Sequence, residues 1–304
     1  MISLINTTIE LALIGSLTVL GLYLSYFTLN VCDLSTDGCF TLGASTAAVI
    51  ALSGHPYLAI IGAMLAGMSS GLIVSLLQTY LGINSLLSGI IVNTALYSVN
   101  IAIMGNSSLL NLNKTRTIYT IVKELFMDTP LKSFVPIIIA LVFTLMVLLF
   151  LNYFLKTRIG LAIKATGDNP IMVEASSINP NITTIIGLCI SNSFTALSGA
   201  LLALSQKSVN IDIGSGMVTI ALASLLIGSI LYRKNNTLVR LICAVLGSFI
   251  FRSIYAIALR FNMPAYLLKL VSAVIVALTI SVPYIKKQLP MFKRRMAIAR
   301  GNRA

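Results

Sequence analysis

Charged side chains and histidine are scarce in this chain of 304 residues. Only 10% of the residues are Asp, Glu, Lys or Arg, only 8 are acidic, and the single histidine is His55. The sequence shows no carboxylate pair on one helix face and no Ser, His and Asp set, so it offers no machinery for an enzyme. It also lacks a G-x-x-x-x-G-K-[ST] loop, which excludes nucleotide binding of the P-loop kind by this chain.

Cysteine is also rare. The four cysteines show no spacing typical of a metal site, and two of them, Cys189 and Cys243, lie within apolar segments. We therefore expect small buried hydrophobic side chains and no metal site. A disulfide between Cys32 and Cys39 is an alternative that the sequence leaves open.

Apolar residues, by contrast, are abundant. They make up 57% of the chain, the mean hydropathy is +0.97, and several uncharged runs approach the length that crosses a bilayer as a helix. The sequence therefore predicts an all-α fold, a polytopic membrane helix bundle with about 8–10 transmembrane helices, over residues 1–285. A basic tail, 286–304, follows it.

The apolar runs give about nine crossings. We expect them near residues 5–29, 40–53, 57–80, 85–104, 134–155, 183–205, 211–232, 238–258 and 266–285. The run at 40–53 is too short for a straight span and follows the polar stretch 30–38, which predicts a broken helix. Gly62, Gly67 and Gly71 offer small residues for close helix contact in the third run.

A polar segment, 156–182, interrupts the apolar sequence. Gly167 permits a turn, Asn169 can cap the amides of a helix, and Pro170 suits its first position. Since Asn179-Pro180 makes continuation unfavourable, we expect a loop, a two-turn helix over about 170–178, and another loop. So short a helix needs a surface to lie on. That surface is either a separate protein or the rest of this chain.

Four stretches together resemble a known family. They are DLSTDGCFTLGA at 33–44, LSGIIVNTALYSVN at 87–100, RIGLAIKATGDNP at 158–170 and ALSGALL at 196–202. In this order they are similar to permease subunits of ABC importers of the branched-chain amino acid and ribose type. The first stretch resembles a subgroup that is often linked to tryptophan- or tyrosine-type substrate-binding proteins.

The resemblance implies partners and a substrate class. The segment 156–182 would carry a cytoplasmic coupling helix that docks on a separate ATPase subunit, which would bind ATP and Mg, so that this chain needs no cofactor. Its ATPase-coupling residues would be Gly167, Asp168, Asn169, Pro170 and Glu174. An extracytoplasmic substrate-binding protein would deliver a small polar solute, an amino acid first and a nucleoside or sugar second. A second permease subunit, expected to be identical, would complete the transporter.

Two groups of polar residues are candidates for the substrate pathway. Asp33, Ser35, Thr36 and Asp37 lie between apolar runs, where carboxylates usually face a cavity or a partner. The alternative is a short hydrated loop. Asn93, Tyr97 and Asn100 are spaced i, i+4, i+7 and share one helix face, which could line a conduit or bond a neighbouring helix. The segment 212–216, DIGSG, faintly echoes Asp37-Gly38, as paired broken segments of a transporter do.

Basic residues predict the orientation. The net charge is +13, and the tail 286–304 is a basic segment suited to anionic lipid headgroups rather than to nucleic acid. With this tail inside the cell, the inner loops hold 13 cations and the outer loops 6, which places the C-terminus and the segment 156–182 in the cytoplasm and the N-terminus outside a cell membrane. The alternative function is an ATP-independent secondary transporter or channel, for which Asp33 and Asp37 are the ion-coupling candidates. A membrane scaffold without transport is a third reading.

Overall fold

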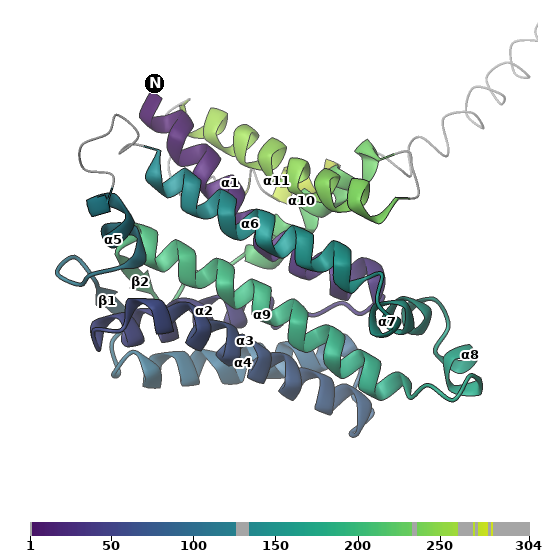
Figure 1. Ribbon diagram of the computed structural model, residues 1–304. Coiled ribbons are helices and arrows are strands. Elements are labelled where there is room, and N and C mark those ends of the chain that lie inside the picture. The colour runs from purple at the N-terminus through teal and green to yellow at the C-terminus, as the bar shows by residue number, and fades with distance from the viewer. Residues whose placement is uncertain are drawn as a thin grey trace, which may run out of the picture.

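A computed structural model describes residues 2–125, 134–232, 236–260, 270, 273–278 and 281. The chain is almost entirely helical (Figure 1). Its elements are α1 (Ile2–Leu22), a π-helical turn η1 (Tyr23–Thr28), α2 (Thr36–Leu52), α3 (Pro56–Thr79), α4 (Ser85–Ile103), β1 (Leu109–Asn111), α5 (Ile118–Leu125), α6 (Val135–Phe154), α7 (Arg158–Asp168), α8 (Pro170–Ala175), α9 (Pro180–Gln206), β2 (Ser208–Asn210), α10 (Met217–Leu231) and α11 (Thr237–Arg260).

Six helices of the described residues are long and apolar enough to span a membrane, which confirms the polytopic helix bundle. Two of them are central: α1 with η1, and α9, have 83% and 78% of their apolar window buried, against 28 to 39% for the other four. Figure 1 shows α9 running the length of the bundle between the group α2, α3, α4 and the group α1, α6. The last predicted crossing, 266–285, lies largely outside the described residues, and the tail 286–304 wholly so.

Small residues bring α3 against α9. A methyl group on Gly67 would lie 2.5 Å from the carbonyl oxygen of Asn192, and one on Gly71 would lie 2.5 Å from that of Leu188. Since these distances are too short for a carbon and an oxygen, only glycine permits this packing. The predicted close contact is confirmed, although Gly62 faces the side chain of Ile50 in α2 instead.

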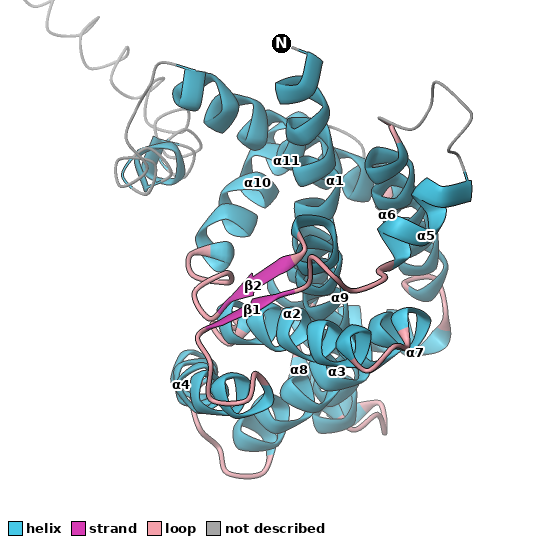
Figure 2. Cartoon of the chain, turned by 90° about the vertical axis from the view of Figure 1, so that its left-hand side faces the viewer, coloured by secondary structure: helices cyan, strands magenta, loops and turns pink. Residues whose placement is uncertain are grey.

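The two ends of the bundle differ. At one end, α7 and α8 project beyond the long helices, far from the N-terminus (Figure 1); we call this the α8 end. The opposite end carries the N-terminus, α5 and a two-stranded ribbon (Figure 2), and we call it the ribbon end. In the ribbon β1 pairs antiparallel with β2, with Leu110 opposite Val209.

Two helices are shorter than a full span. The helix α2 begins at Thr36, after the non-helical residues 29–35, as the short apolar run predicted. The helix α10 is shorter than the predicted crossing 211–232, because the Gly-rich segment 211–216 is non-helical and leaves 15 residues for the helix. The two helices start beside one another inside the bundle and run to opposite ends, α2 to the ribbon end and α10 to the α8 end (Figure 1).

The predicted loop before the coupling helix is also a helix. Residues 158–168 form α7, whose first turn is capped by Thr157, since its hydroxyl accepts a hydrogen bond from the amide of Gly160. Gly167 makes no turn, because it lies in the last turn of α7 against the carbonyl oxygen of Thr28. Gly160 likewise lies against the carbonyl oxygen of Phe154. Both glycines therefore mark close approaches of the backbone rather than breaks in the helix.

Candidate functional site

Asp37 joins the starts of the two short helices. Its carboxylate oxygens accept hydrogen bonds from the backbone amides of Gly216 (2.9 Å) and Val218 (2.8 Å), in the first turn of α10. The first amides of a helix have no partner within the helix, and the helix dipole favours an anion there. Asp37 is therefore an N-cap supplied from another helix, and it ties α2 to α10.

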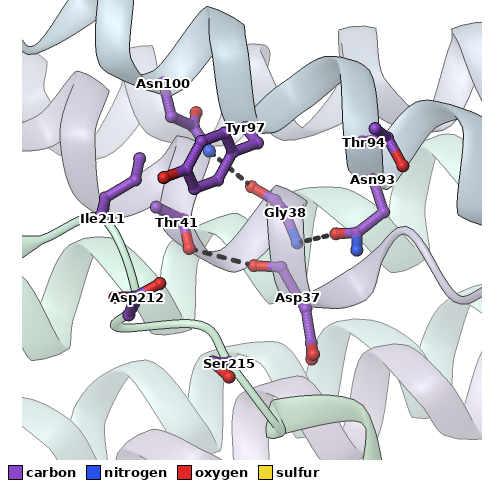
Figure 3. A pocket seen from close by; sticks show the side chains of 10 residues that line it. All are labelled: Asp37, Gly38, Thr41, Asn93, Thr94, Tyr97, Asn100, Ile211, Asp212 and Ser215. Carbon is purple, nitrogen blue, oxygen red and sulfur yellow. Dashed lines mark hydrogen bonds between the residues drawn. The ribbon is translucent and has the colours of Figure 1, made fainter. Parts of the chain in front are cut away.

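The polar face of α4 holds the start of α2 in a similar way. The side-chain oxygen of Asn93 accepts a hydrogen bond of 2.7 Å from the amide of Gly38, and the side-chain amide of Asn100 donates one of 3.2 Å to the carbonyl of Gly38. The predicted polar face of α4 thus bonds a neighbouring helix, which was one of the two alternatives for it. A chain of polar contacts runs from α4 to α2 (Figure 3) and continues from Asp37 to the start of α10.

The same residues line a cavity of about 320 Å³, which lies at the lower end of the range for small-molecule sites (Figure 3). Three elements contribute to its wall: α2 with Asp37, Gly38 and Thr41; α4 with Asn93, Thr94, Tyr97 and Asn100; and the segment after β2 with Ile211, Asp212 and Ser215. Asn100 is 1% exposed and Tyr97 is 51% exposed, so the cavity extends from the bundle interior to its surface.

The other predicted pathway residues lie elsewhere. Asp33, Ser35 and Thr36 are buried and do not line the cavity. One carboxylate oxygen of Asp33 accepts a hydrogen bond from the amide of Ser35 (2.8 Å), and the other accepts one from the side chain of Asn192 (2.9 Å) in the middle of α9. The hydroxyl of Thr36 donates to the carbonyl of Asp33 (3.0 Å). These three residues form a buried turn that anchors the start of α2 to α9, and their part in a pathway stays a prediction.

Sequence reasoning missed Thr41, Thr94 and Ser215 as lining residues and did not select Asp212. A signal for Asp212 and Ser215 was present, because the segment 212–216 repeats the aspartate and glycine pattern of Asp37-Gly38. The two patterns meet in the structure, where Gly214 lies against the backbone of Asp37. Thr41 and Thr94 gave no such signal, since threonines occur throughout the apolar runs.

The predicted coupling residues surround α8. The side chain of Asn169 accepts a hydrogen bond of 3.1 Å from the amide of Met172, so the predicted cap is confirmed, although α8 ends at Ala175 rather than near 178. Asp168, Pro170 and Glu174 are exposed. The apolar side chains Ile171 and Met172 are 78% and 68% exposed. The helix α8 therefore presents two apolar side chains next to exposed polar ones.

Comparisons with known proteins show the family of the chain. Residues 4–282 match the family described as the permease component of branched-chain amino acid transport systems. The chain is 35% identical over 266 residues to the tyrosine transport system permease protein of Clostridioides difficile (strain R20291), which covers 87% of this chain and 86% of the relative. It is 30% identical over 283 residues to the uncharacterized protein RP368 of Rickettsia prowazekii (strain Madrid E), covering 92% and 97% of the two chains.

A solved structure shares the fold. PsaBC from Streptococcus pneumoniae in complex with Fab superimposes with a TM-score of 0.53 over 94% of each chain, at 15% sequence identity. The family match extends over nearly the whole chain, and the two relatives are of similar length. Together they identify the family. The chain belongs to the ABC-type permease family of branched-chain amino acid transport systems, and it is a multi-pass membrane transport subunit.

Proposed function

We propose that this permease imports an amino acid with an aromatic side chain, and that α8 couples it to an ATPase. The support for the substrate is the relative of C. difficile, whose description names tyrosine. The observation that carries the coupling is the exposure of Ile171 and Met172 at the α8 end. ATP and Mg are then bound by the partner chain.

The form of α8 suits a groove on another protein. A six-residue helix is too short to be stable alone, but the Asn169 cap and the buried side chain of Val173 fix it to the bundle. The exposed Ile171 and Met172 can then enter an apolar groove while Asp168 and Glu174 lie at the polar rim, which is the helix-in-groove mode of recognition. Motion of the ATPase would reach η1 through Gly167, which touches Thr28.

We place the α8 end in the cytoplasm and the ribbon end outside, where a substrate-binding protein delivers the solute. The support is the charge count along the sequence, to which Arg233, Lys234 and the tail 286–304, all outside the described residues, contribute most. We propose that two identical subunits form the transporter, because the cavity opens to the bundle surface at the exposed side chains of Thr94 and Tyr97, where a second copy can close it.

Co-purification tests the docking site. The permease is expressed with the ATPase of its transport system, and Met172→Asp is compared with Asn113→Asp, which adds the same charge at an exposed position of the ribbon end. We expect Met172→Asp and Glu174→Lys to lose the ATPase and Asn113→Asp to retain it. An intact complex with both α8 variants contradicts the docking site.

Uptake tests the transport function. Proteoliposomes that contain the complete complex and its binding protein are loaded with ATP, and uptake of tyrosine is compared with that of leucine and a nucleoside. We expect tyrosine uptake that requires internal ATP. Uptake that follows an ion gradient without ATP contradicts the importer and favours a secondary transporter.

A further inference from the structure

We propose that the cavity between α2, α4 and the segment 211–216 binds the α-ammonium group of the transported solute, through the Asp212 carboxylate and the side-chain oxygen of Asn100. This inference rests on the proposed amino acid import and adds the recognition of the solute within the permease. Figure 3 shows the two residues on opposite walls of the cavity, Asn100 on α4 and Asp212 beyond it on the segment after β2.

The first argument is an unmatched acceptor. Asn100 is 1% exposed and lines the cavity, and its side-chain oxygen has no hydrogen-bond partner among the described residues. A buried polar atom without a partner costs free energy. The side-chain amide of Asn100 is already used, because it donates to the carbonyl of Gly38. The oxygen that remains can only accept a hydrogen bond, so it adds an unused acceptor at this wall of the cavity.

The second argument is the balance of donors and acceptors. The hydroxyl of Thr41 donates to the carbonyl of Asp37 (3.1 Å), and the hydroxyl of Thr94 donates to the carbonyl of Ile90 (2.8 Å). Each of these oxygens keeps only its capacity to accept. With the side-chain oxygen of Asn100 and the carboxylate of Asp212, four groups on the wall accept hydrogen bonds. The hydroxyls of Tyr97 and Ser215 can still donate, and so can the side-chain amide of Asn93, whose oxygen is held by Gly38.

The third argument is charge. None of the ten described residues that line the cavity is Lys, Arg or His, and two of them are aspartates. The Asp37 carboxylate is engaged with both oxygens at the start of α10. The side chain of Asp212 is exposed and makes no hydrogen bond or ion pair with the described residues, whereas its backbone amide donates to the side-chain oxygen of Asn210. Asp212 is thus the charge left to pair with a ligand.

An ammonium group matches this wall. It carries a positive charge and three donors and no acceptor, so it suits a wall on which acceptors predominate and the free charge is negative. A neutral sugar lacks the charge, and an anion would be repelled. The carboxylate of an amino acid can then accept from the hydroxyls of Tyr97 and Ser215.

Transport of matched solutes tests the assignment. The complete complex with its binding protein is reconstituted, and ATP-driven uptake of tyrosine is measured for the wild type, Asp212→Asn, Asp212→Glu and Glu124→Gln. Glu124 is an exposed carboxylate at the ribbon end that does not line the cavity. Binding of tyrosine to the isolated binding protein is measured separately and is common to all variants.

We expect Asp212→Asn to lower kcat/KM for tyrosine about tenfold or more, as the loss of one hydrogen bond to a charged group implies. Asp212→Glu should restore most of it, and Glu124→Gln should match the wild type. An inhibition assay adds a second readout: 3-(4-hydroxyphenyl)propionate, which lacks the ammonium, should inhibit Asp212→Asn and the wild type equally weakly.

Two results separate the proposals. If the wild type transports tyrosine and Asp212→Asn does so with unchanged kcat/KM, the ammonium site is overturned and the transport function stands. If the wild type complex transports no amino acid, the proposed function itself fails. If Asp212→Asn and Asp212→Glu lose tyrosine uptake equally, and also lose uptake of any solute without an ammonium group that the wild type transports, Asp212 has a structural role. That result also overturns the inference.

Discussion

Asp37 and Val218 are joined by a hydrogen bond of 2.8 Å across 181 positions of the chain. The contact sets the start of α2 against the start of α10, and so brings two halves of the sequence together at the cavity. Broken helices that meet within a bundle are a recurring device of transporters, because their free backbone groups can face a solute. Here a side chain of one broken helix caps the other.

The cap predicts that Asp37→Asn weakens the junction. The amide side chain has one acceptor oxygen and no charge, so it can satisfy one of the two backbone amides. We expect a loss of about 1 kcal/mol in stability, in the range typical of N-caps, and a larger loss of transport than Asp37→Glu causes. Thermal unfolding of the purified permease and uptake by the reconstituted complex measure the two effects. Unchanged values for both would contradict the role of Asp37 as a cap.

The close contact of α3 and α9 predicts a steric effect. Gly71→Val places side-chain atoms where the carbonyl of Leu188 lies, so the helices must separate. We expect destabilisation of about 1–3 kcal/mol or more, seen as a lower unfolding temperature and aggregation in detergent. Ser69→Val is the matched control, because Ser69 is exposed on the same helix. Equal unfolding temperatures for the two variants would argue against the packing.

The contact of α7 with Thr28 predicts that ATPase binding and transport can be separated by mutation. Gly167→Val pushes α7 away from Thr28 but leaves the exposed surface of α8 intact. We expect the ATPase to remain bound while ATP-driven uptake falls. The control is Ala165→Val, since Ala165 is exposed on α7. Measured uptake and co-purified ATPase decide the outcome, and normal transport by Gly167→Val would exclude this route.

The hydrogen bond between Asp33 and Asn192 predicts that mutations of the two residues have non-additive effects on stability. Asn192→Leu leaves a buried carboxylate with one donor fewer, which costs about 1–3 kcal/mol. The double variant Asp33→Leu, Asn192→Leu should be less unstable than the sum of the single variants, because no charge is left without its partner. Thermal unfolding of all four proteins provides the cycle, and strict additivity would show that the pair does not interact.

The two ends of the bundle predict opposite labelling. In a Cys32→Ser background the remaining cysteines, Cys39, Cys189 and Cys243, are buried. An impermeant maleimide applied to intact cells should label Lys114→Cys, at the ribbon end, and should label Glu174→Cys only after the membrane is opened. The reverse pattern would invert the proposed orientation.

The sequence predicted the membrane helices because span length and hydropathy are local properties. It also predicted the polar face of α4, since Asn93, Tyr97 and Asn100 repeat at the helical period. The partners of these residues were out of reach, because the bonds from α4 to Gly38 and from Asp37 to α10 join positions far apart. The helix α7 was missed because Gly167 suggested a turn, whereas it admits the backbone of Thr28.

The two-stranded ribbon constrains how the walls of the cavity can move. Two hydrogen bonds flank the strand pairing: the amide of Ile211 donates to the carbonyl of Ser108, and the amide of Leu112 donates to the carbonyl of Lys207. The segment after α4 is therefore hydrogen-bonded to the segment after α9. Two walls of the cavity, α4 and the segment carrying Asp212, are therefore tethered and travel together. Both walls are also bonded to α2, through Gly38 and Asp37, so a movement of one wall of the cavity is passed to the other two.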